Sequence, residues 1–101
     1  MKVLSIAIAL TAAVSTPAFA NLAMAQKNAC MACHAVDKKL VGPAYKDVAK
    51  KYASDKNAAD MLASKIMKGG AGVWGAVPMP ANPQVNDAEA KKLAAWVLSQ
   101  K

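Results

Sequence analysis

The chain has 101 residues, and its 13 cationic side chains, all lysine, outnumber 6 acidic ones to give a formal net charge of +7. This length suits one domain with a small core once any leader is removed. The lack of arginine argues against nucleic-acid binding through bidentate contacts to guanine. We interpret the lysines as a solvated basic surface that helps encounter with an acidic partner.

Residues 1–20 have the pattern of a secretory signal peptide. Lys2 supplies the positive start, residues 3–14 the apolar run, and Ala18-Phe19-Ala20 an A-x-A cleavage site. The apolar run is short for a membrane span and no second one follows, so a cleaved leader is favoured over a membrane anchor. We therefore expect a leader over 1–20 and a periplasmic domain over 21–101, which keeps 12 lysines and a net charge of +6.

The pattern over 22–28 predicts a first helix, with Leu22, Ala25 and Ala29 on one side, that leads into Cys30-Met31-Ala32-Cys33-His34. These are the only two cysteines and the only histidine of the chain. A Cys-x-x-Cys-His run is typical of c-type haem attachment, because two thiols at this spacing reach both vinyl groups of one porphyrin while the next side chain meets the iron. We predict one haem c, bound covalently through Cys30 and Cys33.

The motif is also compatible with three other kinds of site. A redox dithiol expects a thioredoxin-like strand before the motif, and none is indicated. A structural zinc site normally has four protein ligands, and the chain offers no further cysteine or histidine. A structural disulfide stays open, although it would leave His34 unexplained.

Three more helices follow in the pattern. Pro43 suits a first turn, with Tyr45, Val48, Ala49 and Tyr52 on one buried face. Asn57 is a candidate N-cap for the next helix, whose stripe is Ala59, Leu62, Ala63 and Ile66 and which Gly69 ends. Asn86 and Glu89 form a capping-box pattern before Ala90, Leu93, Ala94 and Val97, with Trp96 beside the stripe. Because no strand is indicated, the sequence predicts an all-α domain.

A long segment without periodicity, residues 69–85, contains Met79 between Pro78 and Pro80. A run of this length inside a small domain is usually functional. Met24, Met31, Met61 and Met67 fall on or beside helical stretches, where methionine normally fills the core. Two prolines reduce the entropy that the loop loses on folding, so Met79 is our candidate for the second iron ligand, opposite His34.

Several stretches together resemble the small bacterial class I cytochromes c of the c-551/c-552 group. They are the haem motif, Val41-Gly42-Pro43-Ala44-Tyr45-Lys46-Asp47-Val48, Gly72-Val73-Trp74-Gly75, Pro78-Met79-Pro80 and the ending Trp96-Val97-Leu98-Ser99-Gln100-Lys101. The resemblance covers nearly all of 21–101 and implies a small class I cytochrome c fold, about four helices packed around one covalently bound haem. It also implies His34 and Met79 as axial ligands.

The same resemblance implies four supporting residues. Pro43 matches a proline whose surroundings orient the histidine ring, and Trp74 a tryptophan that donates to a haem propionate. Asn82 matches a residue near the methionine sulfur. Lys65 stands where relatives often have an arginine near the propionate, and lysine cannot make the planar two-pronged contact.

The predicted function is one-electron transfer by a monomeric periplasmic carrier. The resemblance implies a cytochrome bc complex as donor and a nitrite reductase or terminal oxidase as acceptor. The alternative is a haem enzyme or gas-binding haem protein with an open sixth position. Peroxide chemistry usually needs an acid/base group and a cation over the open iron face, yet the single histidine is already used and arginine is absent, so we expect no enzyme.

Overall fold

The computed structural model describes residues 17–101, so the first 16 residues of the predicted leader lie outside the described range. The helices are α1 (Pro17–Lys27), the 3₁₀ helix η1 (Cys30–Ala32), α2 (Tyr45–Lys51), α3 (Ala58–Lys68) and α4 (Asp87–Leu98). Within residues 17–101, the strand-like pairing amounts to one antiparallel bridge between Gly70 and Met79. The all-α prediction is confirmed. None of these helices combines the length and the hydropathy needed to cross a membrane.

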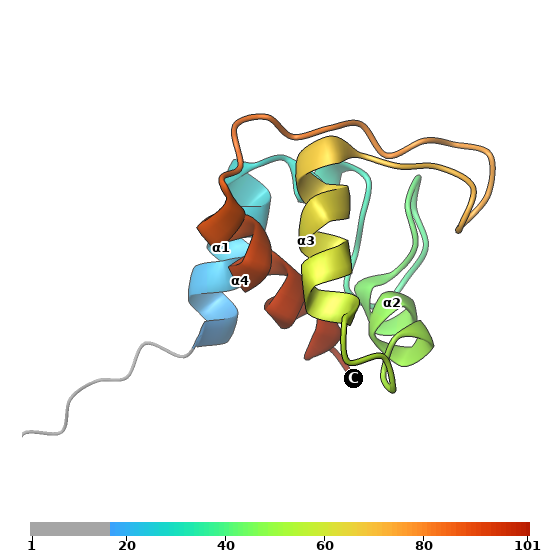
Figure 1. The fold of residues 1–101 in the computed structure, drawn as a ribbon, viewed down its shortest axis with the longest axis horizontal. Helices are drawn as coiled ribbons and strands as arrows, with labels where there is room; N and C mark the ends of the chain where they lie inside the picture. The colour runs from blue at the N-terminus through green and yellow to red at the C-terminus, as the bar shows by residue number, and fades with distance from the viewer. Residues whose placement is uncertain (1–16) are drawn as a thin grey trace, which may run out of the picture.

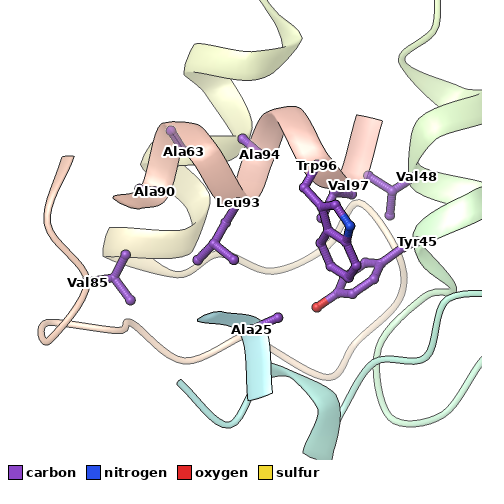
Figure 2. Close-up of a cluster of buried hydrophobic side chains, with 10 residues drawn as sticks. All are labelled: Ala25, Tyr45, Val48, Ala63, Val85, Ala90, Leu93, Ala94, Trp96 and Val97. Carbon is purple, nitrogen blue, oxygen red and sulfur yellow. The ribbon is translucent and has the colours of Figure 1, made fainter. Parts of the chain in front are cut away.

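Helix α4 is the element on which the other helices pack. It contacts α1, α2 and α3, and Figure 1 shows it running obliquely between α1 and α3. Its predicted stripe is buried, and so is Trp96, whose ring meets Tyr45 of α2 edge to face at 5.3 Å between centroids (Figure 2). Because α4 contributes five of the buried core residues, it organises the hydrophobic core (Ala90, Leu93, Ala94, Trp96, Val97).

Helix α1 begins at Pro17, earlier than the predicted Leu22, and so continues across the predicted cleavage point after Ala20. Ala25 is fully buried, as its place in the pattern indicated, but the prediction for Ala29 is wrong. Ala29 is exposed and adopts a left-handed conformation, with φ of 59°. The helix has already ended, and this turn redirects the backbone into Cys30, which is why the helical period does not extend to Ala29.

Helix α2 begins at Tyr45, so the prediction of Pro43 in its first turn is wrong. Ala44 is extended, with φ of −61° and ψ of 141°. The first free amides of the helix donate to the preceding loop, from Tyr45 to the Ala35 carbonyl at 3.0 Å and from Lys46 to Val36 at 2.9 Å. The loop thereby caps α2 and leaves Pro43 outside it.

The two predicted asparagine caps differ in the structure. Asn86 Oδ1 accepts from the Glu89 amide at 2.8 Å, which confirms the cap of α4. Asn57 precedes α3 but makes no capping bond with its side chain, so that part of the prediction is wrong. Its backbone, at φ −98° and ψ 3°, is not in the extended conformation that turns a capping side chain toward the helix. Helix α3 ends at Gly69 as expected, with a positive φ of 76°.

Candidate cofactor site

A cavity of about 280 Å³ lies among the motif, α2, α3, α4 and the loop after α3. This is close to the lower end of the roughly 300–1,000 Å³ that is typical of ligand pockets. Leu62 and Ile66 of the predicted α3 stripe line the cavity and are only half-buried. Of the charged side chains described, Lys39 and Lys65 contribute to the lining and no carboxylate does. The lining therefore fits a large apolar ligand that carries acidic groups, as a haem with its two propionates does.

Cys30 and Cys33 both line this cavity as free thiols. The turn of η1 aligns them, because the Cys33 and His34 amides both donate to the Cys30 carbonyl, at 3.2 and 3.0 Å. Burial is the main cause that raises the pKa of the Cys30 thiol, which keeps it in the neutral form. In residues 17–101 no three cysteine, histidine or acidic side chains gather as a metal cluster would require. Two free thiols that border one cavity are what two thioether links to a single group would need.

The His34 ring is held in a defined orientation by Pro43. Nδ1 lies 2.8 Å from the Pro43 carbonyl oxygen, so Nδ1 carries the proton and donates it. This tautomer leaves the Nε2 lone pair free for a metal. The His34 ring also stacks on the ring of Tyr45, with 4.9 Å between the two centroids and 22° between the two planes. Burial raises the pKa of Tyr45 far above its usual range, so this ring remains a neutral phenol.

Gly42 forms another wall against His34, and the sequence reading assigned it no role. A Cβ at position 42 would collide with the ring at Cε1 and lie 2.8 Å from Nδ1. The Gly42 amide also donates to the Cys33 carbonyl at 2.7 Å, which brings the two segments together. The Gly-Pro pair eight residues after the histidine was the available signal, because glycine permits close backbone approach.

Met79 lines the same cavity and is half-buried. Its backbone pairs with Gly70 in both directions, with the Met79 amide donating at 2.8 Å and the Gly70 amide at 3.1 Å. At Gly69 a Cβ would meet the backbone of Met79, Pro80 and Ala81 at 3.0 Å or less, and φ is positive. The end of α3 therefore fixes the place of the methionine within an otherwise irregular loop.

Two further predicted residues, Trp74 and Lys65, also line the cavity. Trp74 is 41% exposed, and the Lys51 ammonium lies over its ring, 5.6 Å from the centroid. The Lys65 side chain passes close to Gly70, where a Cβ would be 2.8 Å from Nζ. Both side chains thus border the cavity and are also exposed to solvent.

Asn82 lies outside the cavity lining. Its side-chain amide donates to the Ile66 carbonyl at 2.9 Å, and its backbone amide reaches the Ile66 and Met67 carbonyls at 3.2 Å. Asn82 therefore satisfies the carbonyls at the end of α3. The other seven predicted site residues are brought together around the cavity (Cys30, Cys33, His34, Pro43, Lys65, Trp74, Met79).

Known proteins share both the sequence and the fold. The cytochrome c family model matches residues 22–101. Cytochrome c-552 of Hydrogenobacter thermophilus is 64% identical over 84 residues, which are 82% of this chain and 84% of that protein. Cytochrome c-551 of Pseudomonas aeruginosa is 60% identical over 72 residues, 71% of this chain and 68% of that one. The crystal structure of cytochrome c552 from Nitrosomonas europaea has a TM-score of 0.78 at 55% identity, covering 79% of this chain and 99% of that chain.

Similarity of this degree extends over the motif, the helices and the methionine loop together. The relatives are small electron-carrier cytochromes and not enzymes. The protein is thus an electron carrier with haem bound covalently through Cys30 and Cys33, and it belongs to the cytochrome c family, in the class I group of cytochromes c-551 and c-552.

Proposed function

We propose that His34 Nε2 and Met79 Sδ are the two axial iron ligands, and that the protein passes single electrons between respiratory partners in the periplasm. The observation that carries the ligand assignment is the bond from His34 Nδ1 to the Pro43 carbonyl, at 2.8 Å. It leaves only Nε2 as an electron-pair donor, on a ring that borders the same cavity as Met79.

Bound haem supplies a one-electron iron couple. The mostly apolar lining of the cavity offers water few polar partners, which would lower the solvent rearrangement that accompanies a change of charge. The neutral Met79 sulfur favours the ferrous state and gives a higher reduction potential than a second histidine would. If His34 and Met79 both hold the iron, no open position would remain for a substrate, and the bound group would serve electron transfer.

Substitution of Met79 tests this assignment. We expect Met79→Leu to remove the weak long-wavelength absorption band of a methionine–iron(III) bond, to lower the reduction potential and to admit external ligands such as imidazole. Met61→Leu is the matched control, because Met61 also lines the cavity but lies on α3. Retention of the band in Met79→Leu, or its loss in Met61→Leu, would show that the assignment is wrong.

The proposed contact surface for partners contains Met31, Ala32, Pro80 and Ala81, which stand beside the attachment cysteines and the methionine. Ala32, Pro80 and Ala81 are exposed and Met31 is half-buried, a small and mostly apolar set suited to brief docking. Two further exposed apolar side chains, Val41 and Val77, border the same cavity as Pro80. We propose a cytochrome bc complex as donor and a nitrite reductase or terminal oxidase as acceptor, each meeting a monomer.

Exposed lysines that flank the haem motif in sequence, Lys27, Lys38 and Lys39, are suited to steer an acidic partner. Steering of this kind weakens as salt screens the charges, so the bimolecular electron-transfer rate should fall as ionic strength rises. Stopped-flow measurement with a purified acidic partner checks this. A rate that does not change with ionic strength removes the steering part of the proposal.

Export to the periplasm is proposed from the leader pattern of residues 1–20, and the family match starting at residue 22 supports a domain that begins beyond it. Mass measurement of the exported protein should find Asn21 as its first residue. A product that keeps residues 1–20 would contradict the cleavage.

A further inference from the structure

Lys51, the last residue of α2, has two aromatic rings as neighbours. Its ammonium lies 5.6 Å from the centroid of the Trp74 ring and 5.7 Å from that of Tyr52, both within the roughly 6 Å range of cation–π attraction. The ion pair found among the described residues joins Lys91 to Asp87 at 3.0 Å and does not involve Lys51. In this part of the chain, the contacts of the Lys51 charge are therefore aromatic.

Trp74 stands in a turn that has few other restraints. Gly72 and Gly75 flank it with positive φ angles of 91° and 120°, and a Cβ at either position would meet nothing within 4 Å. One hydrogen bond, from the Gly72 amide to the Gly75 carbonyl at 3.2 Å, closes the turn. Val73 and Trp74 are 52% and 41% exposed. The contact between the Trp74 ring and Lys51 of α2 is therefore important for the position of the indole.

We infer that Lys51 is a positioning residue that holds the Trp74 indole at the wall of the cavity. Its ammonium lies over the ring face, which leaves the N–H at the ring edge available to an acceptor inside the cavity. This inference rests on the proposed electron-carrier function and on the role that the family resemblance implies for Trp74, a donor to a haem propionate. It assigns to α2 a function in the haem site besides the support of His34.

The charge of Lys51 has a second consequence for electron transfer. Oxidation adds one positive charge at the iron, and a nearby cation disfavours that state. Lys51 thus raises the reduction potential, and its removal lowers it. Part of this effect comes through Trp74. When the indole N–H no longer donates to the propionate, the negative charge of the propionate is less neutralised, so it stabilises the oxidised iron more strongly and lowers the potential.

Lys50 provides the matched control. It lies beside Lys51 in the last turn of α2 and is also exposed, so both lysines interact with the helix dipole in the same way. Lys50→Met and Lys51→Met remove equal charge from adjacent positions, but only Lys51→Met removes the contact with Trp74. Lys51→Arg keeps both the charge and the capacity for cation–π attraction.

The experiment uses the haem-loaded protein and two readouts. NMR follows solvent exchange of the indole N–H protons of Trp74 and Trp96, with the buried Trp96 as internal reference, and voltammetry gives the potential. We expect Lys51→Met to speed exchange at Trp74 about two- to fivefold, the factor that matches an exposed cation–π contact. It should also lower the potential more than Lys50→Met does. Lys51→Arg should behave as the unaltered protein.

Equal effects of Lys51→Met and Lys50→Met on both readouts would overturn the inference. So would an undiminished effect of Lys51→Met on the potential in a Trp74→Leu background, since the contact is then already absent. The methionine–iron band is recorded for every variant. Its absence from the unaltered protein would count against Met79 as ligand, whereas the exchange comparison would still decide the role of Lys51.

Discussion

At the scale of single residues, Gly42 shows that a glycine can be required by the lack of room for a side chain and not by its backbone angles. It is not among the residues with positive φ, yet its missing Cβ makes room for the His34 ring. We predict that Gly42→Ala displaces the ring, weakens the bond from Nδ1 to Pro43 and destabilises the haem-loaded protein by about 1–3 kcal/mol, as overpacking does. Denaturant unfolding, followed in the haem absorption, measures this.

Gly72→Ala is the control for that prediction. Position 72 has open space but a φ of 91°, so alanine should cost only the backbone strain of roughly 1–2 kcal/mol, without any change in the signals of His34. If Gly42→Ala leaves both stability and the NMR shifts of His34 unchanged, the close packing of ring and glycine does not exist in solution.

A site residue could be predicted from the sequence when the residues that define its role lie within a few positions of it along the chain. Cys30, Cys33 and His34 follow from one motif, because their geometry relative to the cofactor is set within five residues. The wall made by Gly42 and Tyr45 depends on the chain folding back onto His34. The Gly-Pro pair signals a close backbone approach at position 42 but not which side chain lies there. Asn82 shows the same limit, since its bond to Ile66 joins residues 16 apart in sequence.

At the scale of helices, the two asparagines that precede α3 and α4 form a natural comparison. Asn86 accepts from the Glu89 amide at 2.8 Å, whereas Asn57 makes no capping bond with its side chain. We predict that Asn86→Ala lowers the free energy of unfolding by about 1 kcal/mol, the usual value of an N-cap. Asn57→Ala should change it by less than about 0.5 kcal/mol. Thermal unfolding of the two variants checks the difference, and equal losses would contradict the assigned caps.

The periodic stripes predicted the four α-helices found in residues 17–101, but where each helix begins and ends was harder to predict from the sequence. Asn57 fails as a side-chain cap because its backbone is not extended, and this conformation accompanies a local turn in which Asp55 Oδ1 accepts from the Asn57 amide at 2.8 Å. Pro43 lies outside α2 because loop carbonyls of Ala35 and Val36 already cap that helix. Helix ends depend on such contacts, whereas helix interiors depend on the 3.6-residue period.

At the scale of the whole molecule, the protein core is small without its cofactor. More than half of the buried apolar residues are alanines, and no bulky side chain among the described residues is completely buried. Leu62 and Ile66, which should complete the core by their place in the stripe, instead border the cavity and remain half-buried. The haem supplies the apolar surface that is missing, as a metal or disulfides do in other domains of this size.

We therefore predict that covalent haem is required for a stable fold. Cys30→Ala combined with Cys33→Ala removes both attachment points, and this double variant, produced without haem, should lose most of its helical circular dichroism and show no cooperative thermal transition. The reason is that ligand binding free energy becomes folding free energy when the site does not exist in the unfolded chain. Cys30→Ala alone is the control, because Cys33 and His34 still offer one covalent link and one iron ligand. A haem-free double variant that unfolds cooperatively, near the unfolding temperature of the haem-loaded protein, would contradict this prediction. The helices would then pack stably without haem, and the protein core would have to be larger than its buried alanines suggest.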